Sequence, residues 1–355
     1  MALAVLVVVA GLLLAPGTPP REFFGISPQT TLTEEDVEYM EAGGFGTVRW
    51  PLPWEAVQPE EDGEYLWAAV DEVVENAARG GLRVLPVLFG TPSWLAEEPA
   101  VLPVGGERQR QAWSRFVRAA VGRYGAGGTF WRRHKGGGAR AVPVTPVREW
   151  QVWNEANFFY FASPVSPKRY AELLKASAAA IEAVDPRAGV VLSGLFGSPP
   201  VGPPKGMDAA EFLDRLYAVR GVREAFDAAA LHAYAKDIET LERLTEEMRA
   251  AMDDNGDEEA GLLITELGWG SQSDSDVSFE VGSEGQEREL RAAYEYLADD
   301  RDDLNLRSVY WFTWKDLDGV CDFCDSAGLF EEGEGFEPKP AWDAFVDAAE
   351  GEPRP

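Results

Sequence analysis

Two short stretches decide the fold that the sequence predicts: Arg83-Val84-Leu85-Pro86-Val87-Leu88 and Gly261-Leu262-Leu263-Ile264-Thr265-Glu266. In each, apolar residues follow one another without the regular polar alternation of a half-exposed strand. Such runs are typical of strands in a parallel sheet, because helices cover both faces of that sheet. A longer segment with helical periodicity follows each stretch, so each predicts one β-α unit.

The same succession of strand and helix occurs eight times after residue 20. Eight β-α units without a dividing linker predict a single-domain (β/α)8 TIM barrel over residues 21–355. A doubly wound open sheet is the competing architecture, but Ser27-Pro28 follows the first strand where that fold places a glycine-rich phosphate loop. The expected strands are 23–26, 47–50, 83–88, 148–154, 189–194, 226–232, 261–266 and 308–314, and the expected helices are 33–43, 66–81, 108–124, 167–185, 208–219, 238–253, 284–300 and 341–349.

Local signals agree with these helix starts. Thr33 with Asp36 three residues later predicts a capping box, and Ser166-Pro167 predicts an N-cap followed by proline in the first turn. The glycine-rich segment between Gly125 and Gly138 precedes the fourth strand. We expect it to be a loop at the N-terminal face of the barrel with a role in stability.

The charge of the chain limits its partners. Sixty-one acidic residues against thirty-two basic ones give a net charge of -29. Such a surface repels nucleic acids and anionic membranes, so we expect neither as a partner. The simplest interpretation of the charge is a solvated acidic surface, which suits neutral or cationic substrates.

The first fourteen residues, Met1 to Leu14, form an almost unbroken apolar run. The run resembles the core of a signal peptide and is short for a membrane span. We therefore expect residues 1–20 to be a signal peptide and the mature protein to be secreted to the extracellular space. An uncleaved membrane anchor stays open as the alternative, because no Lys or Arg precedes Arg21 and no clear cleavage site is visible.

Two glutamates stand at the ends of predicted strands. Glu155 ends the fourth strand and Glu266 ends the seventh. Catalytic residues of this fold come from the C-terminal strand ends, and strands four and seven face each other across a barrel. Cleavage of a glycosidic bond needs a proton donor and a second carboxylate, and a separation of about 5–5.5 Å implies a covalent intermediate. Together the pair of Glu155 and Glu266 predicts a catalytic site, although a single glutamate at a strand end is more often structural.

The residues around both glutamates resemble a known group of enzymes. Trp153-Asn154-Glu155 resembles the Asn-Glu signature of the large clan of retaining glycoside hydrolases with barrel folds, and Ile264-Thr265-Glu266 is similar to its nucleophile strand. The likeness spans residues 23 to 347 and is nearest to bacterial members of families 39 and 5. Ala156 departs from it, because proline is usual there. Further similar segments are Val48-Arg49-Trp50, His232 with Tyr234, Tyr310-Trp311-Phe312-Thr313-Trp314, Gly328-Leu329-Phe330 and Lys339-Pro340-Ala341-Trp342.

The resemblance implies that Glu155 is the acid/base and Glu266 the nucleophile, and it implies roles for the neighbouring polar residues. Arg49 and Tyr234 would donate hydrogen bonds to Glu266, and Asn154 would bind the 2-hydroxyl of the sugar. His232 would line the same subsite. Outside this context, Arg49 would be interpreted as a buried ion pair and His232 as a core imidazole.

Aromatic rings at the strand ends are candidates for sugar contacts, because the C–H face of a pyranose packs flat on an apolar plane. The sequence places Trp94, Trp269, Trp311 and Trp314 at or just past such ends. Alternation along a regular strand points Trp311 and Trp314 to opposite sides, so we expect one of the two to contact the sugar. The run 158–161 of aromatic residues follows Glu155, and both an outer subsite wall and ordinary loop packing stay open.

Cys321 and Cys324 are the two cysteines of the chain. In an exported protein their spacing favours a local disulfide. Flanking carboxylates disfavour the thiolate that redox catalysis needs, and a zinc site would require two more ligands. We therefore expect no metal.

Together these features predict hydrolysis of a β-linked glycoside or polysaccharide by double displacement, with a carbohydrate as partner and without a cofactor. A transglycosylase acting through the same site is one alternative. A non-catalytic carbohydrate-binding barrel is another, although binding alone needs no pair of glutamates.

Overall fold

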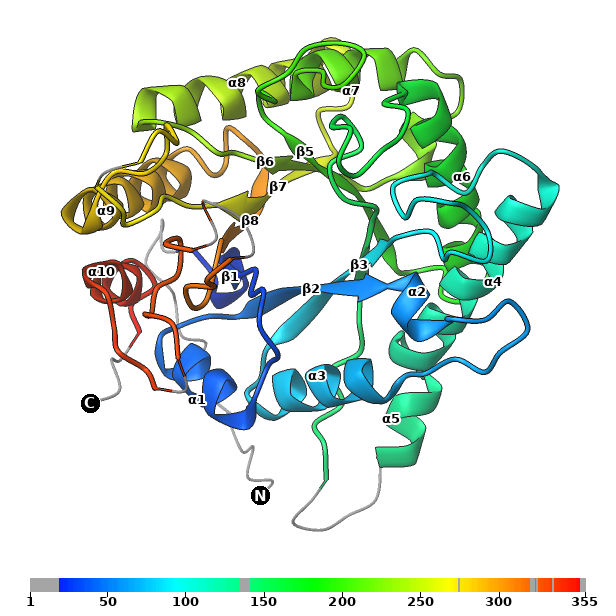
Figure 1. The fold of residues 1–355 in the computed structure, drawn as a ribbon, viewed down its shortest axis with the longest axis horizontal. Helices are drawn as coiled ribbons and strands as arrows, with labels where there is room; N and C mark the ends of the chain where they lie inside the picture. The colour runs from blue at the N-terminus through cyan, green and yellow to red at the C-terminus, as the bar shows by residue number, and fades with distance from the viewer. Residues whose placement is uncertain are drawn as a thin grey trace, which may run out of the picture.

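The computed structural model describes residues 19–134, 141–273, 275–319, 323, 325–333 and 335–351. Its centre is a closed barrel of eight parallel strands in the order of the chain, ringed by helices (Figure 1). The (β/α)8 prediction is confirmed. The strands are β1 Phe24–Ile26, β2 Thr47–Pro53, β3 Arg83–Phe89, β4 Glu149–Val152, β5 Gly189–Phe196, β6 Ala228–His232, β7 Gly261–Leu267 and β8 Leu306–Trp311.

The eight predicted helices are all present, and two short helices that the sequence did not predict accompany them. One of the two, α5, lies in the glycine-rich segment that was expected to be a loop. Four to six residues give too little helical periodicity to be recognised. The helices are α1 Glu34–Ala42, α2 Trp54–Val57, α3 Ala68–Arg79, α4 Glu107–Tyr124, α5 Thr129–His134, α6 Pro167–Glu182, α7 Ala209–Tyr217, α8 Ile238–Asp254, α9 Ser283–Asp299 and α10 Pro340–Ala348, with single 3-10 turns at Arg21–Phe23 and Arg223–Ala225.

Both predicted helix starts are confirmed. The Thr33 side chain accepts from the Asp36 backbone N–H, and the Asp36 carboxylate accepts from the Thr33 N–H at 2.9 Å. At the start of α6, the Ser166 hydroxyl accepts from the Arg169 N–H, and Pro167 occupies the first turn. These bonds satisfy backbone donors that a helix start leaves without partners.

Two strands end earlier than the sequence suggested. Expected to residue 154, β4 stops at Val152, because Trp153 has a φ of 73° and leaves the extended conformation. Expected to residue 314, β8 stops at Trp311, and the Thr313 N–H then bonds the Ala327 carbonyl, outside the sheet. Both departures occur where the chain enters the C-terminal face.

Side chains fill the inside of the barrel. Leu85, Val191, Ala230 and Leu263, from four different strands, form one buried cluster with Tyr310. A second and larger layer of apolar residues lies between the strands and the helices. The barrel is therefore a packed core, and the open space lies above it at the strand ends.

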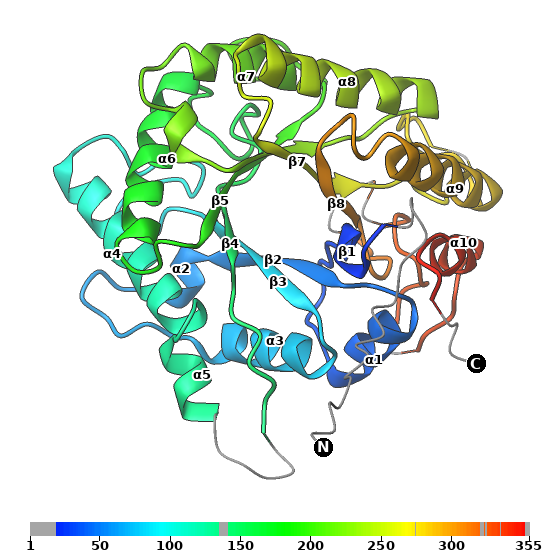
Figure 2. The ribbon, with the colours of Figure 1, turned by 180° about the vertical axis from the view of Figure 1, so that it is seen from behind.

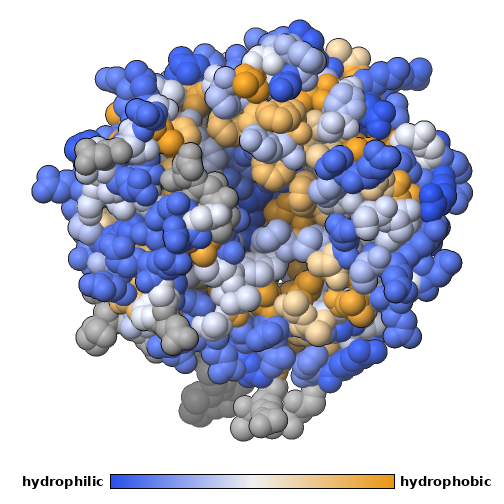
Figure 3. All heavy atoms as spheres, in the orientation of Figure 1, coloured by the Kyte–Doolittle hydropathy of each residue, from blue (hydrophilic) through white to orange (hydrophobic). Residues whose placement is uncertain are grey.

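Figure 1 views the face that carries the C-terminal ends of the strands, and Figure 2 shows the opposite face. A space-filling view in the first orientation shows a hollow at the centre, with a hydrophilic floor and hydrophobic residues along part of its border (Figure 3). The two cysteines and residues 1–18 of the expected signal peptide lie outside the described residues. In the described residues, no helix has the length and apolar character that crossing a membrane requires.

A buried ion pair holds the long segment after β8 in place. The Lys339 ammonium donates to the Asp316 carboxylate at 2.7 Å, to the Ser326 carbonyl at 2.8 Å and to the Ser271 hydroxyl at 3.0 Å. The side chains of Lys339 and Asp316 are 2% and 8% exposed. Burial raises the pKa of Asp316 to about 6, against the opposing effect of Lys339.

We expect Lys339→Met to lower the free energy of unfolding by about 3–5 kcal/mol at pH 8, because it leaves the Asp316 carboxylate buried without its partner. The loss should shrink at pH 5, where Asp316 is protonated. Urea denaturation at both pH values measures it. The control is Arg243→Met, which breaks an exposed pair with Glu247 and should cost about 0.3–0.5 kcal/mol. Equal losses for the two variants would contradict the prediction.

Candidate active site

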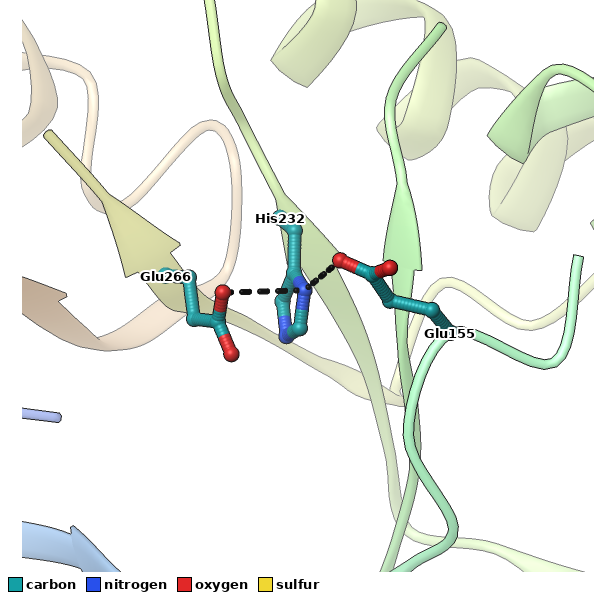
Figure 4. Close-up of side chains that lie close together, drawn as sticks. All are labelled: Glu155, His232 and Glu266. Atoms are coloured by element: carbon teal, nitrogen blue, oxygen red, sulfur yellow. Dashed lines mark hydrogen bonds and ion pairs between the residues drawn. The ribbon is translucent and has the colours of Figure 1, made fainter. Parts of the chain in front are cut away.

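Glu155 and Glu266 converge at the C-terminal face. Glu266 belongs to β7, and Glu155 follows the end of β4. One carboxylate oxygen of each, together with a nitrogen of His232, forms a group whose atoms lie within 4.8 Å of one another (Figure 4). Both glutamates are buried. Carboxylates that work by a covalent intermediate stand about 5–5.5 Å apart and inverting pairs about 6.5–9.5 Å, so this gap fits the first class.

The backbone before Glu155 is turned out of the strand. Trp153 and Glu155 have φ values of 73° and 38°. Left-handed conformations in residues other than glycine cost about 1–3 kcal/mol and concentrate at active sites. The Trp153 N–H bonds the Leu88 carbonyl at 2.9 Å, and the Glu155 N–H bonds the Gly194 carbonyl at 3.1 Å. Bonds to β3 and β5 thus hold the turn that presents Glu155.

Two donors and an imidazole surround Glu266. Arg49 Nη1 donates at 2.6 Å to one carboxylate oxygen, and the Tyr234 hydroxyl donates to the other. His232 Nδ1 lies 3.4 Å from that second oxygen. The structure therefore brings Arg49 and Tyr234 to the carboxylate for which the sequence proposed them. An arrangement of this kind suits an anionic carboxylate that acts as a nucleophile.

The buried Arg49 side chain connects its own strand, β2, to residues in or directly after β1, β4 and β7. Its Nη2 donates to Asn154 Oδ1 at 2.6 Å, its Nε to Gln151 Oε1 at 2.6 Å and its Nη1 also to Ser27 Oγ at 3.1 Å. Sequence reasoning missed Gln151 and Ser27. The signal for Gln151 was a polar residue inside an apolar strand, which must find a buried partner.

His232 lies between the two carboxylates (Figure 4). Its Nδ1 is 2.7 Å from Glu155 Oε1. Burial, and then the charge of Arg49, holds the pKa of His232 well below its ordinary value, so the ring is neutral. Within the described residues, Nε2 has no hydrogen-bond partner, and it lies against Gly194. We therefore place the single ring proton on Nδ1, where it is donated to Glu155.

Gly194 makes room for this imidazole. A Cβ at position 194 would lie 1.9 Å from His232 Nε2 and 2.6 Å from Thr265 Oγ1. We expect Gly194→Ala to displace His232 and lower kcat/KM about 100-fold, since a misplacement of about 1 Å at a reacting group has this effect. The control is Gly202→Ala, because a Cβ at 202 meets nothing within 4 Å. Steady-state kinetics and thermal unfolding of both variants test this, and full activity in Gly194→Ala would refute it.

The two glutamates have different surroundings. Burial, and then the charge of Glu266, raises the pKa of Glu155 well above its ordinary value, while Arg49 opposes the rise. A carboxyl group that stays protonated is what a general acid requires. Burial and Glu266 also raise the pKa of Tyr234, which keeps its hydroxyl protonated as a donor.

The raised pKa of Glu155 has a consequence for stability. Above about pH 4.5 the unfolded chain ionises this carboxyl group, whereas the folded protein keeps it protonated up to its higher pKa. The wild type therefore loses free energy of unfolding as the pH rises between the two values. We expect Glu155→Gln to unfold about 1–3 °C above the wild type at pH 7 and to lose this advantage at pH 4. Calorimetry measures both midpoints, and a pH-independent difference would contradict the explanation.

Three of the four predicted tryptophans do not lie where a sugar could contact them. Trp269, Trp311 and Trp314 have no exposed surface, so their proposed sugar contact is wrong for this structure. Trp269 packs on Trp311, and Trp314 Nε1 donates to Asp36 Oδ1 at 2.9 Å behind the barrel wall. Trp94 is partly exposed, with its Nε1 bonded to the Gln58 carbonyl at 2.9 Å.

Four phenylalanines pack around Tyr234, the tyrosine that donates to Glu266. The ring of Phe312 lies 5.9 Å from that of Tyr234, the partner of Glu266. Phe196 and Phe279 each lie 5.7 Å from Tyr234, and Phe323 lies 5.2 Å from it. They were not predicted, because Phe312 follows the end of β8 and Phe279 and Phe323 lie in loops, where strand alternation does not determine the direction of a side chain.

Glu155, His232 and Glu266 also carry the atom types of a metal site. However, the Arg49 guanidinium bonds Glu266 at 2.6 Å, so a metal ion bound to that carboxylate would lie beside a fixed positive charge. Neighbouring like charges make this group a poor cation site.

The fold and the site together define a (β/α)8 barrel with a buried pair of glutamates at its C-terminal face. A comparison with protein families finds that residues 27–123 match the sequence model of the β-galactosidase family Glyco_hydro_42. No curated protein matches the chain.

Solved structures share the barrel. A family 39 glycoside hydrolase from Bacteroides cellulosilyticus WH2 has 21% identity and a TM-score of 0.66 over 93% of this chain, which spans 64% of that protein's length. A GH5_18 protein from Bifidobacterium longum subsp. infantis has 17% identity and a TM-score of 0.66, with 94% of this chain and 79% of that one covered. Xylanase 10B from Thermotoga maritima has 15% identity and a TM-score of 0.61, with 93% and 95% covered.

The chain thus has the fold of barrel glycoside hydrolases and carries, in residues 27–123, a segment similar to one of their families. Families 39 and 5, to which the sequence showed the nearest resemblance, are among these structural neighbours. The family whose sequence model matches, the β-galactosidases, was not among those expected.

Proposed function

We propose that this protein is a retaining glycoside hydrolase that cleaves a β-linked glycoside or polysaccharide. The observation that carries the proposal is the approach of the Glu155 and Glu266 carboxylates to within 4.8 Å beside Arg49 and Tyr234. The similarity of residues 27–123 to a β-galactosidase family supports it.

In the first step, a carboxylate oxygen of Glu266 attacks the anomeric carbon, and the bond from that carbon to the leaving oxygen breaks. The proton of Glu155 passes to the leaving oxygen, which departs as an alcohol. Burial and the neighbouring Glu266 charge keep that proton in place by raising the pKa of Glu155. A covalent ester between the sugar and Glu266 results.

Formation of this ester removes the negative charge of Glu266. The pKa of Glu155 then loses one of the causes that raise it, and Glu155 can take a proton from water. The water oxygen attacks the anomeric carbon, the ester bond to Glu266 breaks, and the sugar leaves with its original configuration. Glu155 is then protonated for the next cycle.

Neighbouring side chains position the reactants. Asn154 accepts from Arg49 through Oδ1, which leaves its amide N–H groups to donate to the sugar 2-hydroxyl. Such a contact strengthens in the transition state. Neutral His232 donates to Glu155 and fixes its orientation.

A panel of aryl β-galactosides, β-xylosides, β-glucosides and β-mannosides, with linear β-glucans, tests the proposal. We expect turnover of at least one member, and proton NMR at early times should show the β-anomer of the product first. An α-anomer appearing first would refute double displacement. Carbohydrate binding without turnover of any member would favour the non-catalytic barrel instead.

A further inference from the structure

A row of aromatic rings leads outward from the catalytic centre. The Phe196 ring lies 5.7 Å from Tyr234, and the Phe158 ring lies 5.5 Å from Phe196. Tyr160 follows at 5.2 Å from Phe158. We call Phe196, Phe158, Phe159 and Tyr160 the aromatic wall. It begins at the tyrosine that bonds Glu266 and ends at the surface.

Two loops hold the aromatic wall together. Asn157, in the loop after β4, donates from Nδ2 to the carbonyls of Phe196 and Met207 at 2.7 Å each and accepts from the Phe196 N–H at 2.9 Å. The Phe159 N–H bonds the Lys205 carbonyl at 2.8 Å. These bonds tie the β4 loop to the β5 loop and hold the backbone that carries the rings.

Burial in the core accounts for an aromatic residue at Phe158, in the inner part of the aromatic wall, but not at Tyr160, its outer end. Phe158 is 7% exposed and is an ordinary core residue, whereas Tyr160 is 67% exposed, the highest value among the exposed large apolar or aromatic side chains described. The Tyr160 ring lies 4.5 Å from Phe159, and the Lys205 ammonium stands 5.1 Å above the Phe159 ring. An exposed ring packed against a second ring, with an ammonium donor above the second ring, suits a sugar, which offers a C–H face and hydroxyls.

The position of the aromatic wall relative to Glu155 determines which part of a substrate the wall contacts. The wall continues the chain three residues after Glu155, and the Phe158 N–H bonds the Glu155 carbonyl at 2.9 Å. In the proposed mechanism Glu155 protonates the leaving oxygen, and Phe158, Phe159 and Tyr160 of the aromatic wall lie on the loop that carries this acid.

We propose that Tyr160 and Phe159 form a subsite for a sugar ring on the leaving-group side of the scissile bond. The substrate is accordingly an oligosaccharide or polysaccharide in which a second sugar, rather than a small alcohol, is the leaving group. This inference rests on the proposed hydrolase function and specifies the substrate class of the same site.

Partitioning of the covalent intermediate tests the subsite separately from hydrolysis. The enzyme is charged with the aryl β-glycoside that it hydrolyses fastest, and cellobiose, xylobiose, mannobiose or methanol is added as acceptor. The ratio of transfer product to free sugar is measured for the wild type, Tyr160→Ala and Tyr160→Trp. Leu66→Ala is the control, because Leu66 is exposed to 56% and lies on the loop before α3, on another part of the surface.

We expect the wild type to transfer to at least one disaccharide more efficiently than to methanol. Tyr160→Ala should lower the ratio of transfer product to free sugar about tenfold more for the disaccharide than for methanol. One stacked aromatic ring contributes a binding free energy of about this size. Tyr160→Trp should restore the ratio, and Leu66→Ala should leave both ratios unchanged. Equal losses for disaccharide and methanol, or no transfer to any disaccharide by the wild type, would overturn the subsite. Absence of turnover of every aryl glycoside and every β-glucan in the panel would overturn the hydrolase function itself.

Discussion

Glu266→Ala is expected to lower turnover of every substrate by roughly 10⁵-fold, because no other group is placed to attack the anomeric carbon. Glu266 accepts from Arg49 at 2.6 Å and from Tyr234, and no second carboxylate shares these donors in the described residues. Substrates with good leaving groups should lose turnover equally, since the anomeric carbon still needs a nucleophile when the leaving group departs. Release of nitrophenol from an aryl β-glycoside measures the effect.

The variant must be shown to fold, because the substitution leaves the buried Arg49 without its carboxylate. Arg49 keeps bonds to Asn154, Gln151 and Ser27, so we expect the barrel to persist. Circular dichroism and the midpoint of thermal unfolding check this. Glu149→Ala is a matched control at the other end of the barrel, where Glu149 pairs with Arg307 and is 39% exposed. Activity of folded Glu266→Ala above about 1% of the wild type would remove Glu266 from the nucleophile role.

The barrel could be predicted because its strands are buried on both faces. The stretch 83–88 has an apolar residue at almost every position, and this pattern is typical of a strand in a covered parallel sheet. Glu155 and Glu266 could be placed for a related reason. A carboxylate directly after such a run must leave the apolar layer, and in a barrel it emerges at the C-terminal face.

The tryptophans could not be placed by the same argument. Alternation along a strand predicts side-chain direction only while the strand continues, and β8 ends at Trp311. Beyond that point Phe312 reaches the neighbourhood of Tyr234, whereas Trp314 turns to Asp36. Direction after a strand end depends on contacts such as that between Thr313 and Ala327, which the sequence does not specify.

The supporting polar residues also required the structure. Gln151 and Ser27 reach Arg49 because of the register of the closed barrel, in which β1 is the neighbour of β2 and β4 is the neighbour of β3. The need for glycine at position 194 follows from the ring of His232, which comes from the next strand. Each of these contacts depends on strand register, which short apolar runs leave undetermined.

Glu155→Ala is expected to impair a different step of the reaction from Glu266→Ala. Aryl leaving groups such as dinitrophenolate need little protonation, so the first step should proceed, whereas the second step should slow about 100- to 10,000-fold for lack of a general base. A covalent intermediate on Glu266 should then accumulate and be visible by mass spectrometry of the intact protein. Substrates with a sugar leaving group should react very slowly even in the first step.

Azide separates the two roles. It is small and anionic and needs no base, so it should occupy the space that the Glu155 side chain leaves and attack the ester of Glu155→Ala from the same face, giving a β-glycosyl azide. In Glu266→Ala, azide would instead take the place of the nucleophile and give the α-product. The anomeric coupling constants of the two products identify the face of attack. A β-azide from Glu266→Ala together with an α-azide from Glu155→Ala would exchange the two assignments, because each azide reports the position of the carboxylate that was removed.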